Sequence, residues 1–122
     1  QICQLVSDLD VLSGGDLTEI GEKGINLSGG QKARISLARA VYANSDIILM
    51  DDPISALDSH VKHKVFEEVF CDELKHKTRI LVTHAVDFID KADRIAIMEK
   101  GKVKYIGTYE EVQHSDEIQH II

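Results

Sequence analysis

The sequence predicts an α/β protein in which a parallel sheet is flanked by helices. Short, mainly apolar runs recur at Ile47–Met50, Arg79–Thr83 and Arg94–Met98. Runs of this length are typical of strands that are buried on both faces of a sheet. Spacers long enough for helices separate the runs, and crossovers of that kind join parallel strands.

Helical periodicity is found in three segments. Residues 2–12 carry apolar side chains at helical spacing, and a Ser-Gly-Gly sequence ends the pattern. A second helix is predicted to begin at Ser28, a favoured N-cap residue, and to end at Ala43-Asn44-Ser45. The third helix is predicted over Asp58–Leu74, where valines stand four residues apart. Residues 16–26 are polar and punctuated by glycines, which predicts a loop.

The C-terminal part is predicted to form a hairpin and a short helix. Gly101 separates the run Arg94–Met98 from a second strand at Val103–Ile106, and an acidic helix containing Glu110 and Glu111 follows. We also predict a boundary near residues 43–46. It would divide the chain into a helical part, residues 1–45, and a sheet-bearing part, residues 46–122.

Composition limits the kind of partner that the chain can have. Its 122 residues carry a formal net charge of -7, whereas nucleic-acid binding relies on clustered Lys and Arg, so we expect no nucleic-acid partner. No apolar stretch approaches the roughly 20 residues that a membrane helix requires. The two cysteines, Cys3 and Cys71, lack metal-ligand spacing and are expected to be reduced thiols.

The segment Ser28-Gly29-Gly30-Gln31 is a candidate anion site. A helix N-terminus offers unpaired backbone N–H groups and the positive end of the helix dipole. Two glycines at this point remove side chains that would hold a phosphate away from the backbone. The alternative is that both glycines serve the fold alone.

Polar side chains also follow two of the predicted strands. Asp51 ends an apolar strand, a position from which a carboxylate can reach Mg²⁺ directly or through water. His84 follows another strand, and its imidazole could hydrogen-bond a phosphate. Asp58 stands where it could be the N-cap of the helix that follows it.

Four motifs in one order resemble the nucleotide-binding domain of an ABC (ATP-binding cassette) transporter. They match the signature motif, the Walker B segment, the D-loop and the switch histidine, and they are Leu27-Ser28-Gly29-Gly30-Gln31, residues 46–53, Ser55-Ala56-Leu57-Asp58 and Thr83-His84. The flanking segments Gly21–Asn26 and Lys32–Ala40 look like the C subfamily, whose members are similar to multidrug-resistance-associated proteins. The resemblance covers nearly the whole chain. It implies part of a P-loop NTPase-like parallel sheet, with part of the ABC helical subdomain before it.

The resemblance implies a role for each candidate residue. The ATP-binding residues would be Ser28, Gly29, Gly30, Gln31 and Asp58, with Mg²⁺ on Asp51 and with Asp52 and His84 as the catalytic residues. The signature residues would face ATP held by a second cassette, arranged head to tail. Cassettes that hydrolyse ATP well usually have glutamate in place of Asp52, so we expect weak hydrolysis at that site. A similar substitution marks the first cassette of many C-subfamily transporters, which favours a first cassette here.

A glycine-rich loop that ends in Gly-Lys-Ser/Thr is absent from the sequence, and the chain opens on Gln1. We therefore expect the C-terminal portion of a cassette, inactive by itself. The parent protein's transmembrane domains would hold it at the cytoplasmic face of a membrane, where ATP hydrolysis drives transport. Two alternatives stay open. One is a chromosome-maintenance or DNA-repair ATPase of the same superfamily, and the other is a mainly non-hydrolytic regulatory cassette that gates a channel or receptor assembly.

Overall fold

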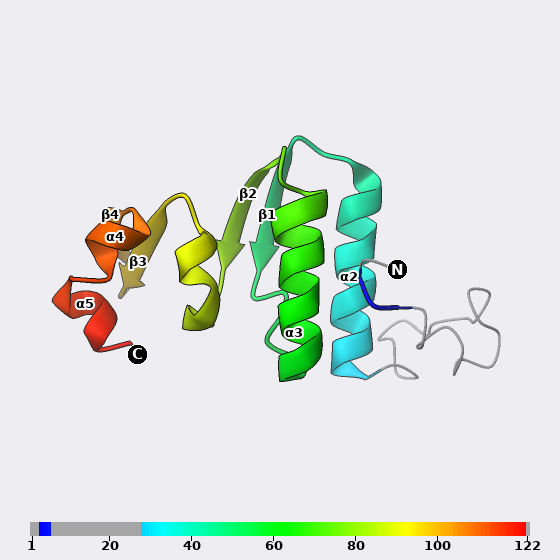
Figure 1. The fold of residues 1–122 in the computed structure, drawn as a ribbon, viewed down its shortest axis with the longest axis horizontal. Helices are drawn as coiled ribbons and strands as arrows, with labels where there is room; N and C mark the ends of the chain where they lie inside the picture. Colours follow the sequence, from blue (N-terminus) through cyan, green and yellow to red (C-terminus); the bar gives the residue numbers. More distant parts are fainter. Residues whose placement is uncertain (1–2, 6–27, 122) are drawn as a thin grey trace. The chain divides into compact units, whose positions relative to one another are not determined.

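The computed structural model describes residues 3–5 and 28–121 of the chain (Figure 1). The chain divides into two compact units, the first ending at Thr83 and the second running from His84 to Ile122. Apart from residues 3–5, the helix predicted at residues 2–12 lies outside the described residues, as does the loop predicted at residues 16–26. The predicted boundary between residues 45 and 46 stays a prediction.

The first long helix, α2, spans Gly29–Ala43 and confirms the predicted limits. Ser28 is its N-cap, in an extended conformation with φ -69° and ψ 163°. Asn44 ends the helix in the left-handed conformation, with φ 53°, and donates its backbone N–H to the Val41 carbonyl at 3.2 Å. Asparagine adopts this conformation more readily than most residues, which explains why the helix ends here.

Strands β1 (Ile47–Asp51) and β2 (Thr78–Val82) form a parallel pair, as predicted. The predicted burial of β1 on both faces is wrong. Ile48 and Met50 are buried, but Ile47 and Leu49 on the other face are 63% and 73% exposed. The reason is the two-residue period of a strand, because within the described residues of the first unit only the face of Ile48 and Met50 is covered.

The segment between β1 and β2 is helical, as predicted for Asp58–Leu74. Helix α3 spans Ser59–Val65 and continues as a π-helix, η2, over Phe66–Glu73. The wider turns are visible in the bond from the Leu74 amide to the Val69 carbonyl, at 2.9 Å. Val65, Phe66, Val69 and Phe70 are buried, together with Ile48 and Met50 of β1. Arg79 of β2, which shares the face of Ile48, donates to the Phe70 carbonyl and so ties η2 to the sheet.

The second unit is a hairpin with short helices. A 3-10 helix, η3 (Val86–Lys91), precedes strands β3 (Ile95–Glu99) and β4 (Lys102–Gly107), and helices α4 (Tyr109–Val112) and α5 (Asp116–Gln119) follow. The predicted hairpin and acidic helix are confirmed. Ile97, Val112 and Ile118 form the core of this unit.

The run predicted at 94–98 forms β3, which pairs antiparallel with β4 in the second unit. Its place in the parallel sheet stays a prediction. Lys100 and Gly101 both have positive φ, 49° and 76°, and this tight turn brings β4 directly alongside β3.

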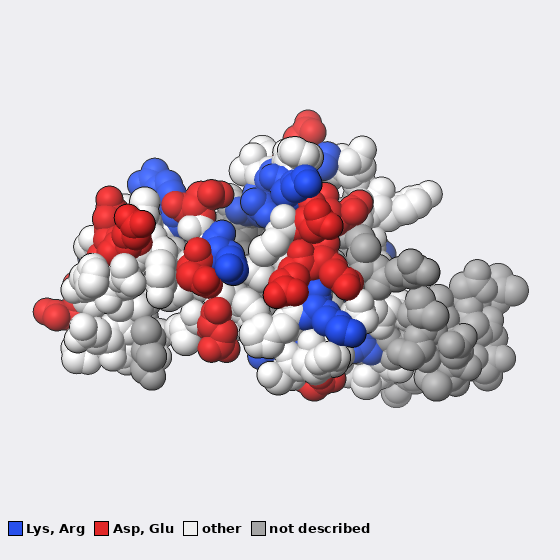
Figure 2. Space-filling view, in the orientation of Figure 1, with Lys and Arg blue, Asp and Glu red and all other residues white. Residues whose placement is uncertain are grey.

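Three further predictions concern the cysteines, the membrane and the surface charge. Cys3 is buried and Cys71 is exposed, neither forms a disulfide, and burial raises the pKa of the Cys3 thiol. Within the described residues, no helix combines the length and apolar character that a membrane span requires. Over the α3 region of Figure 2, Lys and Arg are interspersed with many Asp and Glu side chains, so this surface has no continuous basic stripe.

Candidate functional site

The N-terminus of α2 is built by a capping box. The Gln31 backbone N–H donates to Ser28 Oγ at 3.1 Å, and Gln31 Oε1 accepts the Ser28 backbone N–H at 2.9 Å. The first turn contains no acidic residue. Both capping side chains are uncharged, so neither the cap nor the first turn of α2 neutralises the positive end of the helix dipole. Ser28 and Gly29 are exposed, which leaves this positive end open to an outside anion.

The two glycines differ in what surrounds them. Among the described residues outside the backbone of α2, a Cβ atom on Gly29 would meet the Ala56 methyl, at 3.7 Å, an ordinary contact distance. A Cβ on Gly30 would lie 3.2 Å from the Ala56 carbonyl oxygen, which is tight. Packing among the described residues thus gives a reason for glycine at position 30 and none at position 29. Since glycine near a helix start is less favourable than alanine, these contacts by themselves do not explain Gly29.

Asp51 and Asp52 lie at the carboxyl end of β1, and both are exposed. Asp52 has a left-handed backbone, with φ 47°, and its N–H donates to the Val82 carbonyl at 2.7 Å. Aspartate is among the residues that tolerate this conformation. The chain therefore reverses direction at Asp52, and the bond to β2 fixes where the reversal occurs.

A turn connects Asp52 to α3. Ile54 and Leu57 are buried and hold the turn against the core, while Ser55 and Ala56 between them are exposed. Asp58 then caps α3, because its Oδ1 accepts the Val61 N–H at 3.1 Å. This capping role was one of the two predicted for Asp58. Its role at a cassette interface stays a prediction.

His84 is the first residue of the second unit and is exposed. It directly follows Thr83 after the end of β2, as the sequence predicted. The first unit brings Ser28–Gln31 against the turn that carries Asp52, whereas His84 remains a candidate on sequence alone.

The exposed acids at the end of β1, Asp51 and Asp52, are suited to Mg²⁺ that is bound together with phosphate. The described residues contain no cluster of three or more His, Cys, Asp and Glu side chains that could enclose an ion. Magnesium is usually held by one or two carboxylates together with phosphate oxygens and waters, not by a cage of protein ligands. An exposed Asp51 at a strand end fits that mode of binding.

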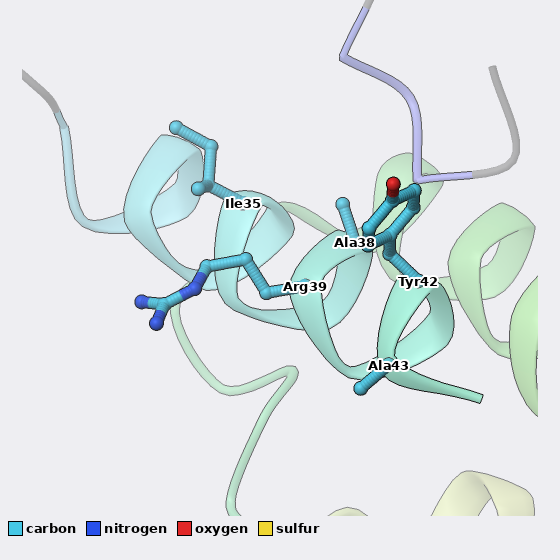
Figure 3. A pocket seen from close by; sticks show the side chains of 5 residues that line it. All are labelled: Ile35, Ala38, Arg39, Tyr42 and Ala43. Carbon is cyan, nitrogen blue, oxygen red and sulfur yellow. The ribbon is translucent and has the colours of Figure 1, made fainter. Parts of the chain in front are cut away.

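A surface hollow of about 430 Å³ lies on α2 (Figure 3). The described residues that line it all belong to α2 and are Ile35, Ala38, Arg39, Tyr42 and Ala43. No acid is among these described residues.

Sequence reasoning missed the contact between Gly30 and Ala56. The two residues are 26 positions apart by their numbers, and no motif spacing reports a close approach of two backbones. The small side chain at position 56 was the one feature of the sequence that favoured a close approach to Gly30. The left-handed conformation of Asp52 was also missed, because aspartate is common in many other backbone conformations.

Comparison with known proteins identifies the family. The family model described as "ABC transporter" matches residues 4–55. The chain is 52% identical over 118 residues to "ATP-binding cassette sub-family C member 3" of Rattus norvegicus and of Mus musculus, which covers 95% of this chain and 8% of each relative. It is 56% identical over 110 residues to "Multidrug resistance protein mrp-7" of Caenorhabditis elegans, which covers 88% of this chain and 7% of that relative.

The chain thus spans 7–8% of the length of these relatives. The match includes the α2 capping box and both acids at the end of β1. Identity above 50% over nearly the whole chain agrees with the resemblance read from the motifs. The chain belongs to the ABC transporter family, as part of a nucleotide-binding cassette of the C-subfamily type.

Proposed function

We propose that this chain is part of an ATP-binding and ATP-hydrolysing cassette, which couples ATP-driven pairing of two cassettes to the transport of a substrate across a membrane. The observation that carries the proposal is the N-terminus of α2. Its backbone N–H groups are held in place by a neutral capping box, with no acid in the first turn. Such a helix start favours a polyphosphate.

Gly29 supports a ligand over a purely structural role. Outside the backbone of α2, the nearest described atom to a Cβ on Gly29 is the Ala56 methyl at 3.7 Å, which leaves space beside this backbone for a phosphate among the described residues. In a head-to-tail pair, the phosphate would belong to ATP held by the partner cassette. Ser28 Oγ already accepts one bond from Gln31, and its hydroxyl hydrogen can still donate to a phosphate oxygen.

The acids at the end of β1 would serve a different ATP molecule, the one on this cassette's own phosphate-binding loop. Bound Mg²⁺ would neutralise charge on the phosphates, and Asp51 is positioned at a strand end to hold it. Asp52 would orient the attacking water, and His84 would hydrogen-bond the terminal phosphate. The Asp52 carboxylate is one methylene shorter than glutamate, and a misplacement of about 1 Å can lower a rate by roughly 10²-fold.

The proposed assembly is therefore asymmetric. Asp52 would belong to a slow site and Ser28-Gly29-Gly30 would complete a fast one, as expected for a first cassette in a polypeptide with two. The partners would be that second cassette and the transmembrane domains, at the cytoplasmic face of the membrane.

The experiment measures ATP turnover by the full-length protein and by two variants. Asp52→Glu should raise phosphate release from the slow site, because the carboxylate then reaches the water. Gly29→Asp should abolish release from the fast site, because a carboxylate would repel the phosphates. The proposal fails if neither variant differs from the unsubstituted protein.

A second candidate, a mainly non-hydrolytic cassette that gates a channel or receptor, is favoured only by Asp52. Vanadate trapping separates the two candidates, because vanadate captures a site that has turned over ATP. Binding of ATP with no trapping at either site would favour the regulator. Trapping at the site completed by Ser28 would favour the transporter.

A further inference from the structure

We infer that Gly30 is a positioning residue whose role differs from that of Gly29: it lets the first turn of α2 rest directly on the backbone of the turn at Ala56. This inference depends on the proposed function, because it concerns how the phosphate-binding amides of α2 are placed. Gly29 leaves room for the ligand, and Gly30 leaves room for the protein's own backbone.

The distances distinguish the two glycines. The position of a Cβ on Gly30 is 3.2 Å from the Ala56 carbonyl oxygen, with Arg34 Nη1 at 3.6 Å and Leu57 Cδ2 at 3.8 Å. The last two atoms are ends of side chains and can move. The carbonyl oxygen is backbone, so a methyl group on Gly30 would push α2 and the turn apart.

The turn has limited freedom to yield. Leu57 is buried, and its N–H donates to the carbonyl of the buried Ile54 at 3.2 Å. At the other end, Ser55 Oγ donates to the Asp52 carbonyl at 3.4 Å, and the Asp52 N–H is bonded to Val82 of β2. Displacing the Ala56 carbonyl therefore strains a segment that is attached to the core and to the sheet.

The opposite side of the contact is less restrained. The start of α2 is exposed at Ser28 and Gly29, and its capping box is made of bonds within the helix start itself. A methyl on Gly30 should thus displace the α2 amides by a few tenths of an ångström and leave the turn nearly in place. Small displacements of groups that stabilise a transition state lower kcat more than they raise KM.

The test uses the full-length protein and substitutes alanine at each glycine, with and without Ala56→Gly. We expect Gly30→Ala to lower kcat for ATP about 3- to 10-fold with KM changed less than twofold. Ala56→Gly frees the turn backbone, so the double variant should recover at least half of the lost kcat. For Gly29→Ala we expect the main effect on KM, with no recovery by Ala56→Gly, because no backbone clash exists to be relieved. The control is Ala43→Gly, an exposed alanine at the other end of α2, which should leave kcat unchanged and rescue neither variant.

Two results would overturn the inference: the same kinetic profile for both glycine variants, or a Gly30→Ala defect that Ala56→Gly does not relieve. Failure of the proposed function gives a separate result, namely no MgATP turnover by the unsubstituted protein. In that case the melting temperature still tests the packing, because Gly30→Ala should lower it and Gly29→Ala should not.

Discussion

Helices α2 and α4 begin with the same hydrogen-bond pattern but differ in charge. At α2, Ser28 and Gln31 exchange backbone and side-chain bonds, and at α4, Thr108 and Glu111 do the same. The α4 box uses a carboxylate, Glu111 Oε2, which accepts the Thr108 N–H at 3.0 Å. The α2 box uses a neutral amide, and its first turn contains no acid.

The difference separates a helix start that stabilises itself from one that can bind a ligand. A carboxylate near the positive end of a helix stabilises the helix by about 0.3–1 kcal/mol, because its negative charge interacts favourably with the helix dipole. At α4, Glu111 also fills the space beside Gly107, where an added Cβ would collide with its carboxylate. The first turn of α2 has no such charge, and among the described residues outside α2 a Cβ on Gly29 would meet only an ordinary contact, the Ala56 methyl at 3.7 Å. The first turn of α2 lacks the stabilisation that a carboxylate would give, and an outside anion can supply it.

The largest expected effect comes from placing a negative charge at the first residue of α2. Gly29→Asp in the full-length protein should lower the rate of phosphate release at saturating MgATP by about 100-fold or more, because a carboxylate would lie within a few ångströms of the phosphates. The fold should survive, since acids are favoured in a first helical turn. Gly29→Asn is the control of matched size. It should lower the rate of phosphate release less, and its effect measures how much of the loss is caused by side-chain size. Equal losses in the two variants would show that the negative charge is not the cause of the slower phosphate release.

Exchanging the two capping boxes should produce a smaller effect. Gln31→Glu gives α2 the box of α4 and should raise KM for MgATP about tenfold, equivalent to about 1.4 kcal/mol, without lowering the melting temperature. Glu111→Gln gives α4 the box of α2 and should leave KM unchanged. Steady-state kinetics and thermal denaturation measure both quantities. An equal KM for the two exchanges would show that the neutral cap of α2 has no part in binding.

The smallest effect is expected from removing the capping hydroxyls. Ser28→Ala and Thr108→Ala should each destabilise the first helical turn by about 1 kcal/mol, or roughly fivefold faster amide exchange there. Hydrogen exchange with mass spectrometry checks both variants without ligand. In the unsubstituted protein, added MgATP should increase protection at the start of α2 and leave protection at α4 unchanged. Equal protection of both helix starts by MgATP would contradict the comparison.

Local chemistry made much of this structure predictable. Ser28 and Asn44 predicted both ends of α2, and Gly101 predicted the hairpin, because caps and turns depend on a few adjacent residues. The burial of a strand face depends on distant residues. The sequence therefore did not show that Leu49 would stay exposed.

The candidate site also combines features that adjacent residues determine with a contact between distant residues. Each of its residues could be named from a motif, and the capping bonds of Ser28 and Asp58 agree with their positions. The contact between Gly30 and Ala56 joins segments that no local pattern connects. The three-dimensional structure was needed to distinguish the two glycines.

The most direct measurement is photolabelling of the full-length protein with an ATP analogue that carries an azidoanilide on its terminal phosphate, followed by mass spectrometry of tryptic peptides. The account predicts Mg²⁺-dependent labelling of the peptide from residue 24 to residue 32, which contains the α2 capping box, and weaker labelling in the Gln31→Glu variant at an analogue concentration below KM. Labelling that never includes this peptide, in a protein that hydrolyses ATP, would contradict the claim that the start of α2 binds the polyphosphate.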